Sequence, residues 1–189
     1  LCAYVAAGID SDHECTELEE AEEKLSRGMY VMIREGSTAK NMEKLLPLLT
    51  IGRSRYRDRL LFVTDDVSVK DLVENGHMDH ILRRAVKLGT DPLDALRMVT
   101  LNAADRFRLT DRGALVPGRR ADIVLFADLE SFHTVHVIKD GTIIYRDGSY
   151  TEEASFDRPE APSMPIKIGE LSEGDFRITA KGKALRVIR

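Results

Sequence analysis

The sequence has no tryptophan, only two cysteines among its 189 residues, and 6% aromatic residues. Two cysteines cannot form a disulfide framework, so we expect a reducing, cytoplasmic environment. The scarcity of aromatic side chains argues against a stacking surface for single-stranded nucleic acid. Since no apolar run approaches the roughly 18 residues of a membrane span, we expect neither a membrane segment nor a signal peptide.

The sequence also has no large excess of acidic or of basic residues. The chain carries 28 basic and 32 acidic residues, a net charge of −4, which excludes long-range steering toward nucleic acid. A hydrophobic content of 43% is enough to form the core of one ordinary domain or two small ones. The chain starts at Leu1 and stops inside a strand-like alternation after residue 184, so we expect it to be a fragment of a longer protein.

Short apolar runs alternate with amphipathic segments over residues 1–110. Buried strands are expected at residues 30–33 and 60–63, which are short apolar runs, and a third short strand is expected at residues 9–11; a helical pattern follows each of the three. The helical patterns cover residues 16–25, with a capping-box signature at residues 16–19, and residues 39–49, 81–89 and 92–106. Repeated strand–helix units predict a parallel sheet with right-handed crossovers.

The pattern changes after residue 110. Strands are expected at residues 113–118, 121–127, 135–139 and 142–146, the last two joined by Asp140-Gly141, a dipeptide typical of two-residue hairpin turns. Residues 152–165 contain three prolines and few apolar side chains, which predicts a linker. Residues 166–189 then begin a further strand-rich segment.

Ionisable side chains follow each of the three predicted parallel strands. Residues 10–14 read Asp-Ser-Asp-His-Glu, residues 34–37 read Arg-Glu-Gly-Ser, and residues 64–66 read Thr-Asp-Asp. In parallel α/β sheets the chemistry gathers where strands end and helices begin. These three passages are therefore the predicted functional site.

Together with Gly76-His77-Met78-Asp79-His80, these passages resemble the adenine deaminases of the amidohydrolase superfamily. The passage from residues 100–104 into residues 117–124 resembles the superfamily more generally. The resemblance implies an α/β fold, namely a partial TIM-type (β/α)8 barrel comprising its last three strands, with an appended small antiparallel β-sandwich. The implied divisions are barrel at 1–110, β-sandwich segment at 111–151, linker at 152–165, and the start of a C-terminal domain at 166–189.

The same resemblance implies a function in purine salvage and adenine catabolism, the conversion of adenine and water to hypoxanthine and ammonia. His13, after the sixth barrel strand, is implied as a metal ligand. Asp65, after the eighth strand, is implied as a metal ligand and as the catalytic acid–base. Arg34, Glu35 and His77 are the candidate substrate-binding residues. The implied cofactor is a divalent metal, Mn²⁺ or Fe²⁺, with two ions per complete site and further ligands upstream.

Each of these residues also has a simpler interpretation. On spacing alone His13 fits a hydrogen-bonded loop histidine better than a ligand, and the resemblance reverses that preference, while Arg34 and Glu35 are equally compatible with a solvated salt bridge. Asp65 and its neighbour Asp66 resemble an N-cap pair. Because adjacent residues on a strand point to opposite faces, only one of these two aspartates is expected to reach the barrel mouth, and we choose Asp65. His77 and His80, one helical turn apart, favour helix capping or a substrate-side role.

Two other functions remain open from the sequence. The chain is also compatible with another metal-dependent amidohydrolase that acts on a cyclic amide or amidine, and with a non-catalytic barrel module. The expected partner is a small-molecule purine. Three parallel strands leave two open sheet edges, which we expect to be covered in a homo-oligomer or by the rest of the protein.

Overall fold

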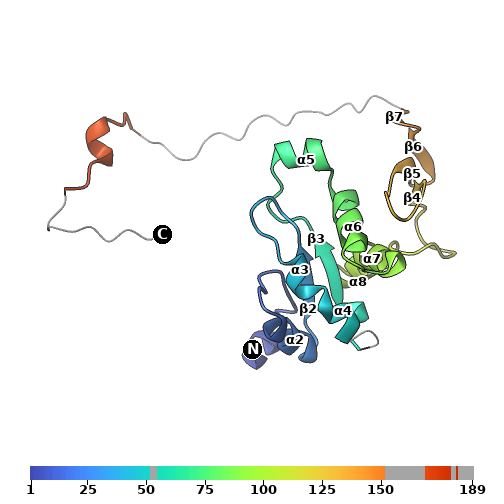
Figure 1. Ribbon diagram of the computed structural model, residues 1–189, viewed down its shortest axis with the longest axis horizontal. Coiled ribbons are helices and arrows are strands. Elements are labelled where there is room, and N and C mark those ends of the chain that lie inside the picture. The colour runs from blue at the N-terminus through green and yellow to red at the C-terminus, as the bar shows by residue number, and fades with distance from the viewer. Residues whose placement is uncertain (52–54, 152–168, 180–181, 183–189) are drawn as a thin grey trace. The chain divides into compact units, whose positions relative to one another are not determined.

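A computed structural model describes residues 1–51, 55–151, 169–179 and 182 (Figure 1). The chain divides into two compact units, Leu1–Glu153 and Ala154–Arg189. The predicted linker at 152–165 lies outside the described residues, as does most of segment 166–189. The described part of the second unit includes the 3-10 helix η2 (Glu173–Phe176), which Ser172 caps. No helix of the described residues is both long and apolar enough to cross a membrane.

The first unit contains a three-stranded parallel sheet with the order β1-β2-β3. Its strands are β1 (Ser11–Asp12), β2 (Tyr30–Arg34) and β3 (Leu60–Val63). The first strand begins later than expected, because residues 8 and 9 close helix α1 (Cys2–Ala6). The amide of Gly8 (φ +90°) donates to Val5, and the amide of Ile9 donates to Tyr4.

The two faces of this sheet have different surroundings. Val31, Ile33, Leu60 and Phe62 are buried in one hydrophobic cluster with side chains of the surrounding helices. The intervening residues of β2 and β3 point to the opposite face, since successive side chains on a strand alternate. Arg34, the last residue of β2, therefore projects from the face opposite to this cluster.

Among the described residues of the first unit, seven further helices surround or extend the parallel strands. They are α2 (Leu18–Ser26), α3 (Met42–Leu45), α4 (Pro47–Ile51), α5 (Val69–Asn75), α6 (Met78–Lys87), α7 (Pro92–Val99) and α8 (Leu101–Arg106), with the 3-10 helix η1 (Arg57–Arg59) before β3. The helix expected at 39–49 is divided because Pro47 has no amide to donate. The helix expected at 92–106 is likewise interrupted at Thr100.

The observed helix starts confirm one of the expected N-caps and contradict another. The side chain of Asp91 accepts from the amides of Leu93 and Asp94, at 2.9 and 3.3 Å, and so caps α7 as expected. The capping box expected at residues 16–19 is wrong, because α2 begins after Glu17 without a side-chain cap.

A second sheet in this unit is antiparallel, with the order β4-β5-β6-β7. Its strands are β4 (Ile123–Phe126), β5 (Thr134–Lys139), β6 (Thr142–Arg146) and β7 (Ser149–Tyr150). The hairpin turn lies at Asp140-Gly141 as predicted, with φ angles of +50° and +80° that fit a type I′ turn.

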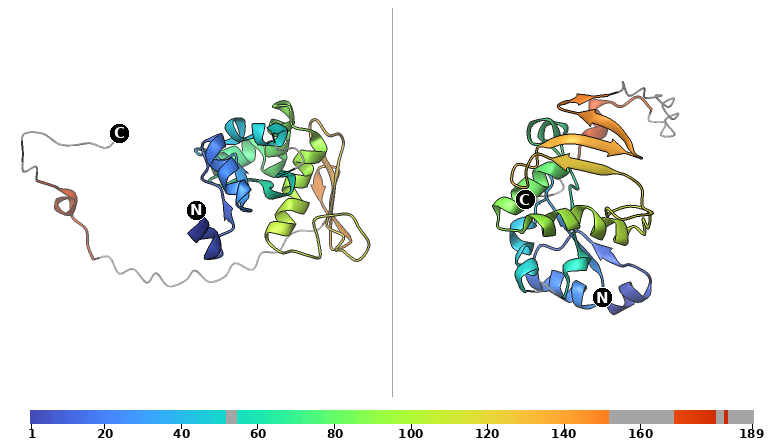
Figure 2. Two further views of the ribbon diagram at one scale, coloured as in Figure 1. Left: turned by 90° about the horizontal axis from the view of Figure 1, so that it is seen from below. Right: turned by 90° about the vertical axis from the view of Figure 1, so that its right-hand side faces the viewer.

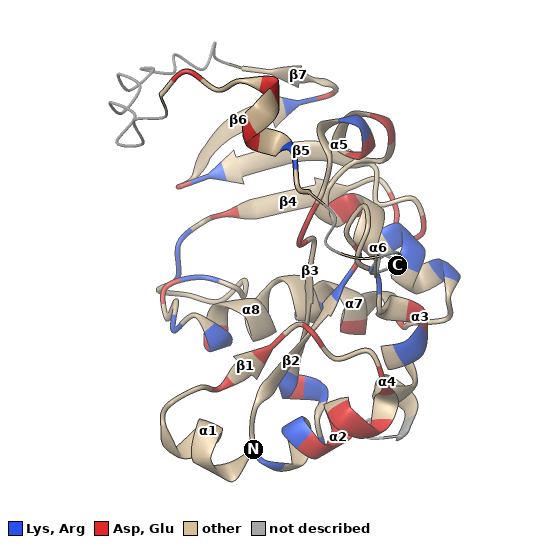
Figure 3. Ribbon diagram, turned by 90° about the vertical axis from the view of Figure 1, so that its left-hand side faces the viewer, with Lys and Arg blue, Asp and Glu red and all other residues tan. Residues whose placement is uncertain are grey.

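The strand expected at 113–118 is wrong, since these residues form bends and turns. Gly113 and Gly118 both have positive φ angles, which an extended strand does not accommodate. The antiparallel sheet still joins the core through Phe132, which is fully buried and meets Phe126 edge-on at 5.4 Å between ring centroids. Helices α7 and α8 lie between the two sheets (Figures 2 and 3).

Candidate active site at the strand ends

A series of charged side chains links the carboxyl ends of the three parallel strands. The Nη1 atom of Arg34 lies 2.9 Å from a Glu14 carboxylate oxygen and 3.1 Å from Oδ2 of Asp65. Glu14 in turn lies 3.3 Å from Nε2 of His13. The structure therefore brings the predicted residues His13, Arg34 and Asp65 into one group.

The two adjacent aspartates after β3 have different partners. Asp65 has a left-handed backbone conformation, with φ at +57°, which is uncommon outside glycine and concentrates at functional sites. Asp66 faces the loop after β2, where it accepts hydrogen bonds from the hydroxyl and amide of Thr38 and from the amide of Ala39. The hydrogen bond from the Thr38 side chain is the main reason that the pKa of Asp66 lies below its usual range. Asp65 is left to interact with Arg34.

Gly36 allows this loop to approach Asp66 closely. A Cβ atom at position 36 would overlap the Asp66 carboxylate and would lie 3.0 Å from the carbonyl oxygen of Thr64. The residue is buried, so a methyl group has no open space to enter.

We expect Gly36→Ala to destabilise the protein by about 1–3 kcal/mol, the usual range for overpacking a filled site. In an Asp66→Ala background the same substitution should have a smaller effect, since the overlapping carboxylate is gone. Urea unfolding of the four proteins of this double-mutant cycle measures the difference. Equal losses in both backgrounds would contradict the proposed close approach.

Glu35 lies on the opposite side of β2 from Arg34. Its side chain is 1% exposed, and Oε1 is 2.9 Å from Nε of Arg84 on α6 and 3.7 Å from Nζ of Lys40. Neither carboxylate oxygen has a well-directed hydrogen bond among the described residues. The structure thus separates Glu35 from the group of His13, Arg34 and Asp65.

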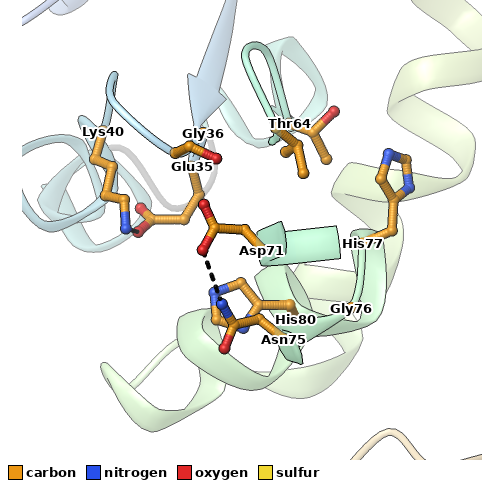
Figure 4. A pocket seen from close by; sticks show the side chains of 11 residues that line it. Glu35, Gly36, Lys40, Thr64, Asp71, Asn75, Gly76, His77 and His80 are labelled. Carbon is orange, nitrogen blue, oxygen red and sulfur yellow. Dashed lines mark hydrogen bonds and ion pairs between the residues drawn. The ribbon is translucent and has the colours of Figure 1, made fainter. Parts of the chain in front are cut away.

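A pocket opens beside Glu35 (Figure 4). Its lining comes from the loops after β2 and β3 and from α5 and α6: Glu35, Gly36, Ser37, Lys40, Thr64, Val67, Asp71, Asn75, Gly76, His77 and His80. The predicted residues Glu35 and His77 line this pocket, whereas Arg34 and Asp65 do not. Burial lowers the pKa of His80 and so favours its neutral imidazole.

One cluster among the described residues has the composition of a metal site. Asp12, Cys15 and Glu20 place ligand atoms within 4.8 Å of one another. The Nζ of Lys24 occupies the middle of this group, 2.9 Å from Asp12, 2.6 Å from Glu20 and 3.5 Å from the sulfur of Cys15. Burial, and then Asp12, raises the pKa of Cys15 to about 12, so the thiol stays protonated. A lysine ammonium therefore already supplies the cation here.

The donor types of His13 and Asp65 fit a divalent transition metal. An imidazole nitrogen and a carboxylate oxygen are ligands that manganese, iron and zinc all accept. Catalytic sites of this kind usually have three or more protein ligands. The two residues thus fit part of a metal site.

Several residues at these strand ends were not predicted from the sequence. Asn41, Asp66 and Arg84 each contact a predicted residue or the loop that carries it. Asn41 stands directly before a helix, where asparagine ordinarily indicates a cap. For Arg84, on an amphipathic helix, the sequence carries no signal that distinguishes it from a solvent-exposed charge.

The comparisons with known proteins agree on one family. A model described as the amidohydrolase family matches residues 1–144. The chain is similar to adenine deaminase 2 of Carboxydothermus hydrogenoformans, with 45% identity over 100% of the chain and 32% of that protein. It is also similar to the adenine deaminase of Methanoculleus marisnigri, with 46% identity over 100% of the chain and 34% of that protein.

The chain therefore spans about a third of the length of the curated relatives it matches. Among solved structures, it is similar to a β-aspartyl dipeptidase of Fervidobacterium islandicum AW-1, with a TM-score of 0.58 and 19% identity over 74% of this chain and 39% of that one. It is also similar to an enamidase, with a TM-score of 0.55 and 14% identity over 77% and 43% of the two chains. At these identities the structural likeness concerns the fold alone.

Proposed function

The chain belongs to the amidohydrolase family, and from this we propose that the whole protein containing it is an adenine deaminase. The observation that carries the proposal is the 45–46% identity to adenine deaminases along the full chain. The reaction would convert adenine and water to hypoxanthine and ammonia, a step of purine salvage and adenine catabolism.

We propose that β1, β2 and β3 are the sixth, seventh and eighth strands of a TIM-type barrel. Three neighbouring parallel strands in sequence order are consistent with this assignment. A complete barrel takes about 250 residues, so the remaining strands would come from the rest of the protein. In the same proposal residues 1–110 are barrel, 111–151 belong to a small β-sandwich, 152–165 are a linker, and 166–189 start a C-terminal domain.

Asp65 is the proposed catalytic acid–base. Oδ2 of Asp65 is held by Arg34 at 3.1 Å, while Oδ1 makes no hydrogen bond among the described residues and is free to accept a proton. In the proposed reaction the proton of the attacking water passes to Asp65 as oxygen bonds to C6 of adenine. Asp65 then returns the proton to the amine nitrogen, the C6–N bond breaks, and ammonia leaves.

His13 and Asp65 are the residues of this chain that would hold the metal. A divalent cation in such a site lowers the pKa of a water molecule toward 7 and so supplies the nucleophile. Mn²⁺ or Fe²⁺, two per complete site, is the proposed cofactor. Arg34, by bridging Glu14 and Asp65, would fix the direction in which the Asp65 carboxylate faces.

We place the substrate side of the site at Glu35, His77 and Arg34. Glu35 and His77 line the pocket beside the strand ends, where acceptor and donor groups suit the ring nitrogens of a purine. Arg34 lies outside this pocket and forms an ion pair with Asp65, one of the proposed metal ligands. We further propose a cytoplasmic protein that assembles as a homo-oligomer.

A substrate assay on the whole protein tests this function. We expect release of equimolar hypoxanthine and ammonia from adenine in the presence of Mn²⁺ or Fe²⁺. Dihydroorotate and an imidazolone are the comparison substrates, because other amidohydrolases open such cyclic amides. Turnover of either one in place of adenine would assign a different amidohydrolase reaction, and no turnover of all three would favour a non-catalytic module.

A further inference from the structure

Asn41 is a buried polar residue at the start of helix α3 that does not cap it. It stands at the N-cap position, where an asparagine side chain usually accepts a hydrogen bond from the first helical turn. Here it makes no such bond, and the residue is only 3% exposed. Its amide group must therefore find its partners elsewhere.

Those partners are main-chain atoms at the end of β2 and in the loop after β1 that carries His13. Oδ1 of Asn41 accepts from the amide of Arg34 at 2.8 Å. Nδ2 donates to the carbonyl oxygens of Cys15 at 2.9 Å and of His13 at 3.4 Å. The main-chain amide of Asn41 also donates to the carbonyl oxygen of Arg34, at 3.1 Å. Asn41 thus holds Arg34 on both its amide and its carbonyl group.

The position of this side chain follows from the way in which β1 and β2 separate. The two strands pair at Ser11–Tyr30 and Asp12–Val31, and β1 ends at Asp12. Continuing this register by three residues would place Cys15 opposite Arg34. Instead the Asn41 amide lies between them and hydrogen-bonds to both. The Arg34 amide needs a hydrogen-bond acceptor and the Cys15 carbonyl oxygen needs a donor, and an amide side chain provides both.

We propose that Asn41 is a positioning residue that sets the distance between the ends of β1 and β2 and thereby directs His13 and Arg34 toward Asp65. The inference rests on the proposed function for its catalytic consequence. The proposal that Asn41 holds the two strand ends depends only on hydrogen bonds within this chain. Replacing a residue that holds a metal ligand in position, without itself binding the metal, commonly lowers metal affinity or activity by about 10–100-fold.

The test compares Asn41→Ala with Asn41→Asp in the whole protein. A carboxylate keeps the acceptor for the Arg34 amide but has no N–H to donate to Cys15 and His13. We expect hydrogen exchange at the Arg34 amide to accelerate in Asn41→Ala and to stay near that of the parent in Asn41→Asp. Exchange at the Glu14 amide should accelerate in both variants, because both release the loop that carries His13.

We expect catalytic activity to fall in both variants, because both release the loop that carries His13. Both variants should lower kcat for adenine by about 10–100-fold, with less change in KM, and should retain less bound metal after dialysis. Asn102→Ala is the matched control, because Asn102 is fully buried and donates to the carbonyl oxygens of Arg57 and Leu60 at the opposite end of β3. It should lower thermal stability with little change in kcat.

Two results would overturn the proposal. One is parent-level kcat in Asn41→Asp, and the other is a fall in kcat for Asn41→Ala no larger than for Asn102→Ala at the same loss of stability. If the parent itself does not act on adenine, the proposed function fails, and exchange at Arg34 and Glu14 still decides whether Asn41 holds the two strand ends.

Discussion

Asp65→Asn in the whole protein is expected to lower the rate of adenine deamination by at least about 10²–10⁴-fold, the usual contribution of general acid–base catalysis. The amide has nearly the shape of the carboxylate, so the left-handed turn at this residue is preserved. It cannot take the proton from water, and it is a poorer metal ligand than a carboxylate. Loss of metal would add to the loss of the base.

Steady-state hypoxanthine production with excess adenine measures this effect. Asp105→Asn is the control, because Asp105 is exposed on α8 and its side chain makes no hydrogen bond or ion pair within the described residues. It should retain the parent's rate. An Asp65→Asn enzyme that forms hypoxanthine as fast as the parent would refute the proposed mechanism.

His13→Ala should remove one of the proposed metal ligands and with it most of the activity. We expect a loss greater than the roughly 10–100-fold caused by replacing outer partners of a ligand, because the ligand itself is gone. Metal content after dialysis should fall in parallel, measured by elemental analysis of the same samples used for kinetics. His77→Ala should behave differently, with an increased KM for adenine and unchanged metal content, since His77 lines the pocket and Asp65 is not among its lining residues.

His133→Ala supplies the matched control for both histidines. His133 is exposed beside β5 of the antiparallel sheet, so its replacement should change neither metal content nor kinetics. If His13→Ala retains full metal content, the histidine is a hydrogen-bonded loop residue, as its contact with Glu14 would also permit.

The parallel strands β2 and β3 could be predicted because apolar runs flanked by helical patterns are strong local signals, whereas β1, which has no such run, begins later than expected. The same reasoning placed ionisable residues at three adjacent strand ends, and His13, Arg34 and Asp65 do lie together. Alternation of side chains along a strand predicted that only one of Asp65 and Asp66 reaches the site, and the family resemblance favoured Asp65. In the structure the backbone leaves the extended conformation at Asp65, so the two side chains separate for a different reason.

The remaining features depend on contacts between distant segments. Nothing local distinguishes Glu35, which turns toward Arg84 on a helix about fifty residues later, from Arg34 beside it. The role of Asn41 was hidden because its position before a helix indicates a cap. The strand expected at residues 113–118 failed because two glycines with positive φ angles outweighed a short apolar run.

The lysine at the centre of the Asp12, Cys15 and Glu20 cluster has a consequence for how the protein responds to chelators. A bound metal leaves when a stronger ligand competes for it, but the Lys24 ammonium is covalently attached and cannot be extracted. Although burial alone would lower the pKa of Lys24, Glu20 and Asp12 raise it, so the charge persists through the neutral range. The segment just before and after His13 is therefore anchored by a non-exchangeable counter-ion. Removing the proposed catalytic metal should leave that anchor in place, so that we expect the demetallated protein to regain metal without refolding.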